Sequence, residues 1–267
     1  MLPIRLITFV LGFATIIQAL PADEKVDSLP EMDPFDKYGL YSGYVPLGNT
    51  TKTIHYLFVQ SQQDTNATDP LILWYNGGPG CSSMLAFATE HGPWVLPDGE
   101  TNFTANPFSW NREANVLYVE QPAGVGFSYC DNDKHPEDCT FNDTTAAADN
   151  LAFLLAWYEK YPEYQKNDLY VSGESYAGIY VPYLVSEIYD QNQNTTGFKI
   201  PIKGMMVGNG VTNWEYDTYP AFIEMAYYHS LYSDELYESM VFASCNYSYF
   251  LFDPEISRVC DAYYGVF

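Results

Sequence analysis

The stretch that decides the fold is Leu169-Tyr170-Val171-Ser172-Gly173-Glu174-Ser175-Tyr176-Ala177-Gly178. Its first four residues are typical of a short buried strand, and the chain from about Tyr176 to Tyr189 predicts a helix. Gly173 and Ala177 stand two positions before and after Ser175. A sharp turn from strand to helix has room only for small residues at those two positions, so the spacing predicts a turn that exposes the Ser175 hydroxyl.

This turn makes Ser175 a candidate nucleophile. A Gly-x-Ser-x-small pattern alone is frequent by chance, and the strand before it and the helix after it give it weight. The N-terminus of the following helix also favours negative charge that develops beside the serine.

The rest of the chain alternates between predicted strands and helices. Further strands are predicted at 53–60, 70–75, 115–119 and 202–207, because these runs are apolar or rich in β-branched and aromatic residues. A helix capped by Asp143 or Thr144 should end before Pro162. Its expected buried face is Ala148, Leu151, Ala152, Leu155 and Tyr158. Such alternation predicts an α/β fold with a mainly parallel sheet and helices on both faces.

Composition narrows the class of protein. The 267 residues carry a formal charge of -23 and are 47% hydrophobic and 17% aromatic, which predicts a folded chain with a sizeable core. So negative a surface repels phosphate backbones and excludes nucleic acid as an expected partner, and it suits an acidic compartment. No cofactor and no metal site are expected, and the sequence does not indicate an oligomeric state.

The N-terminus predicts entry into the secretory pathway. Arg5 precedes a short apolar run from Leu6 to Ile17, and Ala19 ends a small-residue cleavage site, so residues 1–19 are expected to be a signal peptide. An uncleaved anchor is the alternative, but the run is short for a membrane span, and no later run has that length. Six sequons predict glycosylation at Asn49, Asn66, Asn102, Asn142, Asn194 and Asn246.

Five cysteines fit an oxidising compartment. Cys130 and Cys139 would close a polar loop, and Cys245 with Cys260 is the second expected pair. Cys81 is then left over, which needs an explanation in a secreted protein.

A second glycine-rich stretch follows the strand at 70–75. Trp74-Tyr75-Asn76-Gly77-Gly78-Pro79-Gly80-Cys81-Ser82-Ser83 would expose backbone N–H groups that could receive an oxyanion or a carboxylate, although composition alone favours a tight turn.

Four segments together resemble the serine carboxypeptidases of the cathepsin A and carboxypeptidase Y types. The segments are 74–83, 106–111, 114–129 and 173–182, and the resemblance runs from about residue 33 to 214. It implies an α/β-hydrolase fold that occupies residues 20–213. Residues 214–267 are then expected to begin a helical, disulfide-bearing insertion that forms a cap.

The resemblance also implies roles for individual residues. Ser175 matches the nucleophile, and the N–H groups of Gly78 and Tyr176 match the oxyanion hole. The groups that match those gripping the C-terminal carboxylate of a peptide substrate are Asn76, the Gly77 N–H, Glu90 and Glu174. Cys81 matches a cysteine bridged to a later part of the chain.

The resemblance further implies an acid-favoured serine-type carboxypeptidase in a lysosome- or vacuole-like compartment or outside the cell. If the pKa values of Glu90 and Glu174 are raised, both remain protonated in mild acid and donate hydrogen bonds to the substrate carboxylate. An acyltransferase on the same scaffold is an alternative that Glu174 disfavours, since those enzymes tend to carry Asp there. A non-catalytic peptide-binding protein is another.

The remaining members of a catalytic triad are not identified in this sequence. His55, His91, His135 and His229 all lie outside the family's Gly-His-x-x-Pro context, and Asp149, Asp168 and Asp217 are interpreted as solvated or capping residues. The chain is therefore expected to stop before the last strands and before the Asp and His of the triad. It should then have no meaningful activity alone. A shortened product or incomplete gene model, and a genuine short family member, both remain open.

Overall fold

The structure is a computed structural model that describes residues 21–30, 38–63, 68–214, 216–217, 219–243, 245 and 260. The expected signal peptide and the predicted glycosylation sites Asn66 and Asn246 lie outside the described residues. Of the helices that are described, none is long and apolar enough to cross a membrane.

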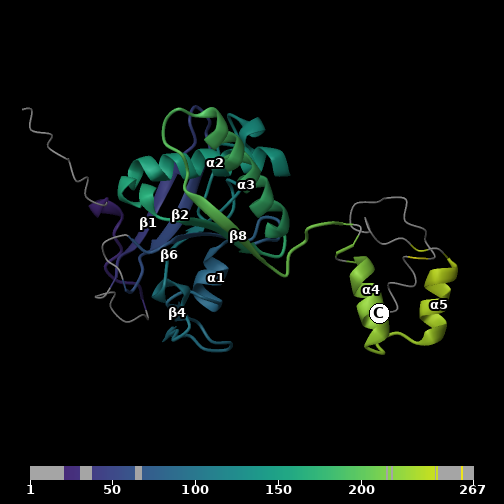
Figure 1. The fold of residues 1–267 in the computed structure, drawn as a ribbon. Coiled ribbons are helices and arrows are strands. Elements are labelled where there is room, and N and C mark those ends of the chain that lie inside the picture. The colour runs from purple at the N-terminus through teal and green to yellow at the C-terminus, as the bar shows by residue number, and fades with distance from the viewer. Residues whose placement is uncertain are drawn as a thin grey trace, which may run out of the picture.

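A six-stranded sheet with the order β1-β2-β6-β3-β7-β8 forms the centre of the fold (Figure 1). Its strands are β1 (Leu40–Pro46), β2 (Thr53–Val59), β3 (Leu71–Tyr75), β6 (Asn115–Val119), β7 (Leu169–Glu174) and β8 (Ile202–Gly208). The pairs from β6 through β3 and β7 to β8 are parallel, and β1 and β2 add two antiparallel pairs at one side. The predicted mainly parallel α/β sheet is confirmed.

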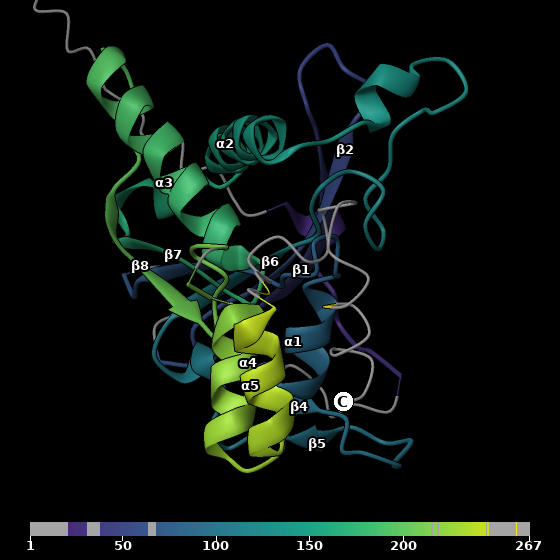
Figure 2. The same cartoon turned by 90° about the vertical axis from the view of Figure 1, so that its right-hand side faces the viewer.

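Helices cover both faces of this sheet (Figures 1 and 2). The helices are α1 (Met84–Thr89), α2 (Asp143–Lys160) and α3 (Ala177–Asn194). The fold also has short 3-10 turns at Ala22–Glu24, Trp110–Arg112, Pro136–Cys139 and Pro162–Lys166. A small two-stranded ribbon is formed by β4 (Trp94–Val95) and β5 (Thr104–Ala105). Alternate strand residues face opposite sides: Leu73 and Leu117 pack under α2 and α3, whereas Trp74 and Tyr118 pack under α1.

Helix α2 differs in detail from its prediction. Its N-cap is Asn142, whose side chain accepts from the Thr145 N–H while the Thr145 hydroxyl accepts from the Asn142 N–H. Neither Asp143 nor Thr144 takes this position. Of the expected face, Tyr158 is buried and Leu151 and Leu155 are partly buried against the core, whereas Ala148 and Ala152 are exposed, because the larger rings pack against the sheet from a neighbouring stripe. That buried stripe contains Ala146, Ala147, Asn150, Phe153, Leu154, Trp157 and Tyr158.

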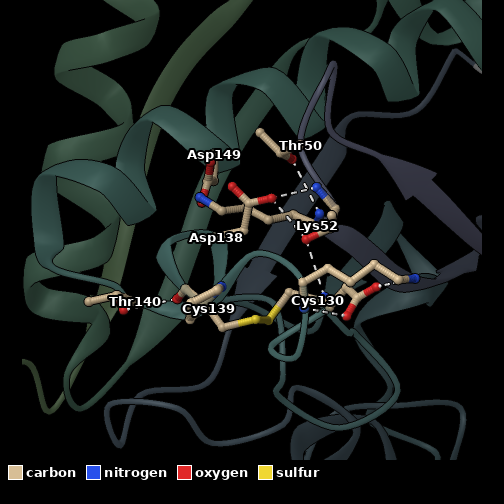
Figure 3. Close-up of a disulfide and its surroundings, with 11 residues drawn as sticks. Thr50, Lys52, Cys130, Asp138, Cys139, Thr140 and Asp149 are labelled. Carbon is tan, nitrogen blue, oxygen red and sulfur yellow. Dashed lines mark hydrogen bonds and ion pairs between the residues drawn. A yellow bond between two sulfur atoms is a disulfide. The ribbon is translucent and has the colours of Figure 1, made fainter.

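The predicted Cys130–Cys139 disulfide is present, with an S–S distance of 2.01 Å, and it closes a loop against the start of β2 (Figure 3). In this loop Asp138 accepts from the N–H and the hydroxyl of Thr51, at 2.7 and 2.8 Å. Nearby, Lys52 pairs with Asp149 at 2.7 Å. The side chain of Asp149 is only 18% exposed, so its interpretation as a solvated or capping residue is wrong.

Two helices, α4 (Tyr219–Tyr228) and α5 (Asp234–Phe242), follow β8 and pack against each other around Ile223, Ala226 and Met240. Cys245 and Cys260 form the second predicted disulfide beside them. Figure 1 shows this pair set apart from the sheet at the end of a connecting segment. The division of the chain at residues 213 and 214 stays a prediction.

Candidate functional site

Ser175 occupies the turn between β7 and α3. Its φ angle of 57° lies in the left-handed region, which a non-glycine residue adopts only where the surrounding structure enforces it. The Ser175 N–H donates to the Gly208 carbonyl at 3.0 Å, and the Ser175 carbonyl accepts from the N–H groups of Gly178 and Val211. These bonds hold the turn at both ends and leave the Ser175 residue exposed.

The small residues on either side of Ser175 are required by contact. A Cβ atom on Gly173 would lie 2.5 Å from the Cβ of Ala177 and 2.4 Å from the Tyr75 carbonyl oxygen. A Cβ on Gly178 would lie 2.3 Å from the Val211 carbonyl oxygen. The turn is therefore closed against β3 on one side and against the segment after β8 on the other.

The glycine-rich loop after β3 lies directly against this turn. Since β3 and β7 are neighbouring parallel strands, with Tyr75 opposite Gly173, the segments that follow them meet at one sheet edge. A Cβ on Gly77 would lie 2.4 Å from the Tyr176 amide nitrogen and 2.8 Å from the Ser175 Cβ. Only glycine permits so close an approach, which brings the loop's backbone N–H groups beside the serine.

Asn76, Glu90 and Glu174 form a polar cluster next to Ser175. The Asn76 amide Nδ2 donates to Glu174 Oε1 at 2.7 Å. Glu90, at the C-terminus of α1, lies close enough to both Asn76 and Glu174 for each to shift the pKa of its carboxyl group. Three separate segments thus place two carboxyl groups and one amide together, and their role in binding a substrate carboxylate stays a prediction.

Glu90 has a perturbed acidity. Partial burial raises the pKa of its carboxyl group and the charge of Glu174 raises it further, although the Asn76 amide acts in the opposite direction. The Glu90 carboxyl group therefore retains its proton to higher pH than an ordinary glutamate.

Sequence reasoning missed the residues that orient Asn76. The Trp74 indole N–H donates to Asn76 Oδ1 at 2.8 Å, and the Asn76 N–H donates to the Ser83 hydroxyl at 3.1 Å. The Trp74 ring packs edge-on against His91, at 4.3 Å between ring centroids. Both Trp74 and Ser83 stand in the same glycine-rich stretch, so their proximity in sequence was the available signal.

All four histidines of the chain have their ring contacts elsewhere. His55 contacts Ser42 and Glu120, and His91 contacts Tyr118 while stacking on Trp110. His135 pairs with Glu137, and His229 bonds to the Met225 carbonyl within α4. Within the described part of the chain, therefore, no histidine is seen to serve Ser175 as a base.

The aspartates considered as triad members are also engaged elsewhere. Asp217 accepts from the N–H groups of Thr212 and Asn213, a capping role, and Asp168 pairs with Lys203 at 3.4 Å on the surface.

Other predicted positions lie on the surface. Cys81 is exposed and forms no disulfide with another described cysteine. Asn49, Asn102, Asn142 and Asn194 are exposed, and their glycosylation stays a prediction. No group of three or more His, Cys, Asp or Glu residues suited to a metal occurs among the described residues.

A pocket of about 370 Å³ adjoins the turn. It is lined by Pro79, Gly80, Phe141, Asp143, Tyr176 and Tyr180, among others. At its wall the Tyr176 hydroxyl donates to Asp143 Oδ1 at 3.0 Å, and the Tyr180 hydroxyl accepts from the Gly80 N–H at 3.2 Å. These bonds tie α2, α3 and the glycine-rich loop together around Ser175.

Comparison with known proteins agrees with this geometry. The family model described as serine carboxypeptidase matches residues 30–262. Serine carboxypeptidase-like 21 of Arabidopsis thaliana is 40% identical over 88% of this chain and 47% of its own length. The lysosomal protective protein of Mus musculus is also 40% identical, over 90% of this chain and 48% of its own length. The chain spans about half the length of the curated relatives it matches.

Among solved structures, a prohormone-processing carboxypeptidase from Saccharomyces cerevisiae has a TM-score of 0.74. The two share 23% of their residues over 93% of this chain and 57% of the yeast chain, so this likeness concerns the fold. It confirms the α/β-hydrolase fold.

Proposed function

Because the chain belongs to the serine carboxypeptidase family, we propose that the protein releases C-terminal residues from peptides through an acyl-enzyme on Ser175. The observation that carries this proposal is the contact between the strained Ser175 turn and the Asn76, Glu90 and Glu174 cluster. A nucleophile placed beside a site for one carboxylate suits cleavage next to a peptide C-terminus.

In this proposal Ser175 Oγ attacks the last peptide carbonyl. The N–H groups of Gly78 and Tyr176 receive the oxyanion, since the close approach of Gly77 to Tyr176 brings the loop alongside the turn. The α3 N-terminus adds its positive dipole end at the same place. The amine leaves with the C-terminal residue, and water then releases the acyl group.

The substrate's free carboxylate is held by Asn76, the Gly77 N–H, Glu90 and Glu174. Two ionised glutamates would repel it, whereas a protonated Glu90 can donate a hydrogen bond to it. Because burial and Glu174 raise the pKa of Glu90, the protonated form persists into mild acid, and activity should be favoured below neutral pH.

In this proposal none of the four histidines, all of which lie in the described part of the chain, acts as the base for Ser175. Each of the four histidines is engaged elsewhere, and loss of triad members lowers kcat by about 10⁶-fold in a comparable enzyme. A polypeptide of residues 1–267 alone should therefore show negligible peptidase activity.

The site of action is proposed from the predicted signal peptide, the predicted glycosylation sites, the disulfides and the net charge of -23. One relative is named a lysosomal protective protein. Together these support the secretory pathway and an acidic lysosome- or vacuole-like compartment, or the extracellular space.

The test compares two substrates in the protein as its natural source makes it. An N-blocked dipeptide with a free carboxylate should release its C-terminal residue, its C-terminal amide should react far more slowly, and Ser175→Ala should abolish both reactions. Equal rates on the two substrates would contradict the carboxylate site. Transfer to an added alcohol in preference to water would indicate an acyltransferase, and peptide binding without turnover would indicate a non-catalytic binding protein.

A further inference from the structure

Glu120 is a buried carboxylate that the proposed reaction does not use. It directly follows β6 and is 0% exposed. Its Oε2 accepts from the Phe127 N–H at 2.8 Å and contacts His55 Nδ1 at 2.9 Å, and its Oε1 accepts from the Ser82 hydroxyl. A buried acid with three partners from three segments is a candidate for a specific role.

The carboxylate group is enclosed on its remaining side by a glycine. Gly126 has a φ of 55°, and a Cβ atom there would lie 1.9 Å from Glu120 Oε1. The chain therefore folds over Glu120 at a position where only glycine fits.

Glu120 is ionised in this environment. Burial alone would raise the pKa of its carboxyl group, but the hydrogen bonds from His55, Ser82 and the Phe127 N–H outweigh burial and lower the pKa. Hydrogen bonds to an ionised acceptor are stronger than those between neutral groups, so the negative charge strengthens its hold on all three partners.

Two loops meet at Glu120. The glycine-rich loop ends at Ser82 and Ser83, and the Ser83 hydroxyl donates to the Val119 carbonyl at 2.7 Å while Ser82 reaches Glu120. The loop after β6 is fixed by Phe127 and by Ser128, whose hydroxyl donates to the Glu120 carbonyl at 2.6 Å. Both loops are thereby fastened to the end of β6.

A displacement at Ser82 would be transmitted to the nucleophile turn. Only four residues separate Ser82 from Gly77, and the Cys81 N–H donates back to the Gly77 carbonyl at 3.0 Å. Gly77 in turn lies against Tyr176 and Ser175 with no spare space. The position of the Gly78 N–H relative to Ser175 thus depends on where Ser82 is held.

We infer that Glu120 is a positioning residue, which holds the Gly78 N–H in its oxyanion-binding position through Ser82. His55 supports Glu120 from the opposite side, at the junction of β1, β2 and β6, and Ser42 contacts the far nitrogen of His55 at 2.9 Å. This inference rests on the proposed function, in which Gly78 binds the oxyanion.

The test uses paired serine variants at the two ends of this array. Ser82→Ala removes the hydroxyl bond to the Glu120 carboxylate on the loop side, and Ser42→Ala removes a hydroxyl bond to the His55 ring on the far side from the loop. In the natural full-length protein, Ser82→Ala should lower kcat about tenfold with KM within about twofold, since a displacement of about 1 Å can cost about 10²-fold. Ser42→Ala should leave kcat unchanged. Ser82→Thr keeps the hydroxyl and should therefore have the kcat of the wild type.

Glu120→Gln should lower kcat at least as much as Ser82→Ala, because it loses the charge that holds the loop. If that variant does not fold, the serine variants decide. Wild-type kcat in folded Ser82→Ala, with only the melting temperature reduced, would overturn the inference and leave a hydrogen-bonded cluster that merely stabilises the fold.

Amide hydrogen exchange separates this inference from the proposed function. Ser82→Ala should accelerate exchange across residues 77–83, and Ser42→Ala should not. If the wild-type protein has no peptidase activity, the proposed function fails, and the exchange rates still decide whether Glu120 holds the loop. Unchanged exchange at 77–83 in Ser82→Ala would contradict the inference whatever the activity.

Discussion

The Nδ2 amide of Asn76 donates a 2.7 Å hydrogen bond to Oε1 of Glu174, and so joins the loop after β3 to the last residue of β7. The Trp74 indole N–H donates a hydrogen bond of 2.8 Å to Oδ1 of the same Asn76 side chain. The side chain of Asn76 is thereby fixed in one orientation, with its nitrogen toward the carboxyl pair.

Changing Asn76 should affect recognition of the substrate carboxylate. Asn76→Asp adds a third acid to the cluster, so we expect kcat/KM for a free-carboxylate dipeptide to fall about 10²-fold, the effect of two to three kcal/mol of lost binding. The slower reaction of the dipeptide amide should change little. Asn132→Asp, which adds the same charge on the exposed disulfide loop, is the control. An equal fall for acid and amide substrates would argue against this role of Asn76.

The pH dependence of kcat/KM should follow the protonation of the Glu90 carboxyl group. Because its pKa is raised by burial and by Glu174, kcat/KM should be highest where Glu90 is protonated and should fall as the pH rises through its raised pKa. Glu90→Gln keeps a neutral donor at all pH values and should flatten this fall. A wild-type profile that still rises above about pH 8 would be inconsistent with a protonated carboxylate grip.

Glu90 also affects stability with a definite sign. A raised pKa means that the folded state binds more protons than the unfolded state, so stability falls as the pH rises from the ordinary glutamate range to the raised value. We expect the melting temperature to decline across that window in the wild type and less in Glu90→Gln. A decline of the same size in both proteins would assign it to other groups.

His91 should give stability a pH dependence opposite in sign to that from Glu90. Burial lowers the pKa of its ring to about 4, so the unfolded state binds a proton more readily, and stability should fall as the pH drops from about 6.5. His91→Phe keeps an aromatic ring between Trp110 and Tyr118 without a titrating group, and its stability should vary less over this range. His135→Phe, at an exposed histidine, should behave as the wild type.

The close packing around the turn at Ser175 can be tested by adding one methyl group at Gly173. Gly173→Ala places a Cβ 2.4 Å from the Tyr75 carbonyl oxygen and 2.5 Å from Ala177, so we expect a loss of about 1–3 kcal/mol in the free energy of unfolding. Gly197→Ala meets only Thr195 Oγ1 at 3.6 Å and should be close to neutral. Urea unfolding of both variants measures the difference, and equal stabilities would refute the close packing.

Removal of the Cys130–Cys139 disulfide should destabilise the fold. Its cysteines are nine residues apart, and the chain-entropy estimate for so short a loop is roughly 2–3 kcal/mol. The double Cys→Ser variant should also free Asp138 from Thr51 (Figure 3). Urea unfolding of this variant and of the wild type, both without reductant so that the Cys245–Cys260 disulfide stays intact, should show this loss, and an unchanged midpoint would contradict it.

The sequence predicted the elements whose signal is local. The strand at 115–119 has the predicted bounds and that at 169–172 extends by two residues, because continuous apolar runs suit a buried parallel strand. The role of Gly173 and Ala177 was also predictable, since steric demand at a turn depends on near neighbours. Strand β1 was missed: Gly43 and Pro46 weaken its pattern, and its pairing with β2 stabilises it.

The side-chain contacts at the candidate site and around Glu120 were harder to predict, because they join residues that are distant in the sequence. Glu120 and His55 are 65 positions apart, and Asn76 and Glu174 are 98 apart. The second pair could be predicted only from resemblance to a family, and the first pair gave no signal at all. Short α1 was missed because six residues carry too little periodicity, yet its C-terminus places Glu90.

Whether Ser175 is the nucleophile can be tested by covalent labelling. The natural protein should be treated with a serine-reactive fluorophosphonate and the adduct located by peptide mass spectrometry. One adduct is expected, on Ser175; its formation should be slowed by a dipeptide with a free carboxylate but not by the dipeptide amide, and it should be absent from Ser175→Ala. An adduct on another serine, or C-terminal hydrolysis that survives Ser175→Ala, would contradict it.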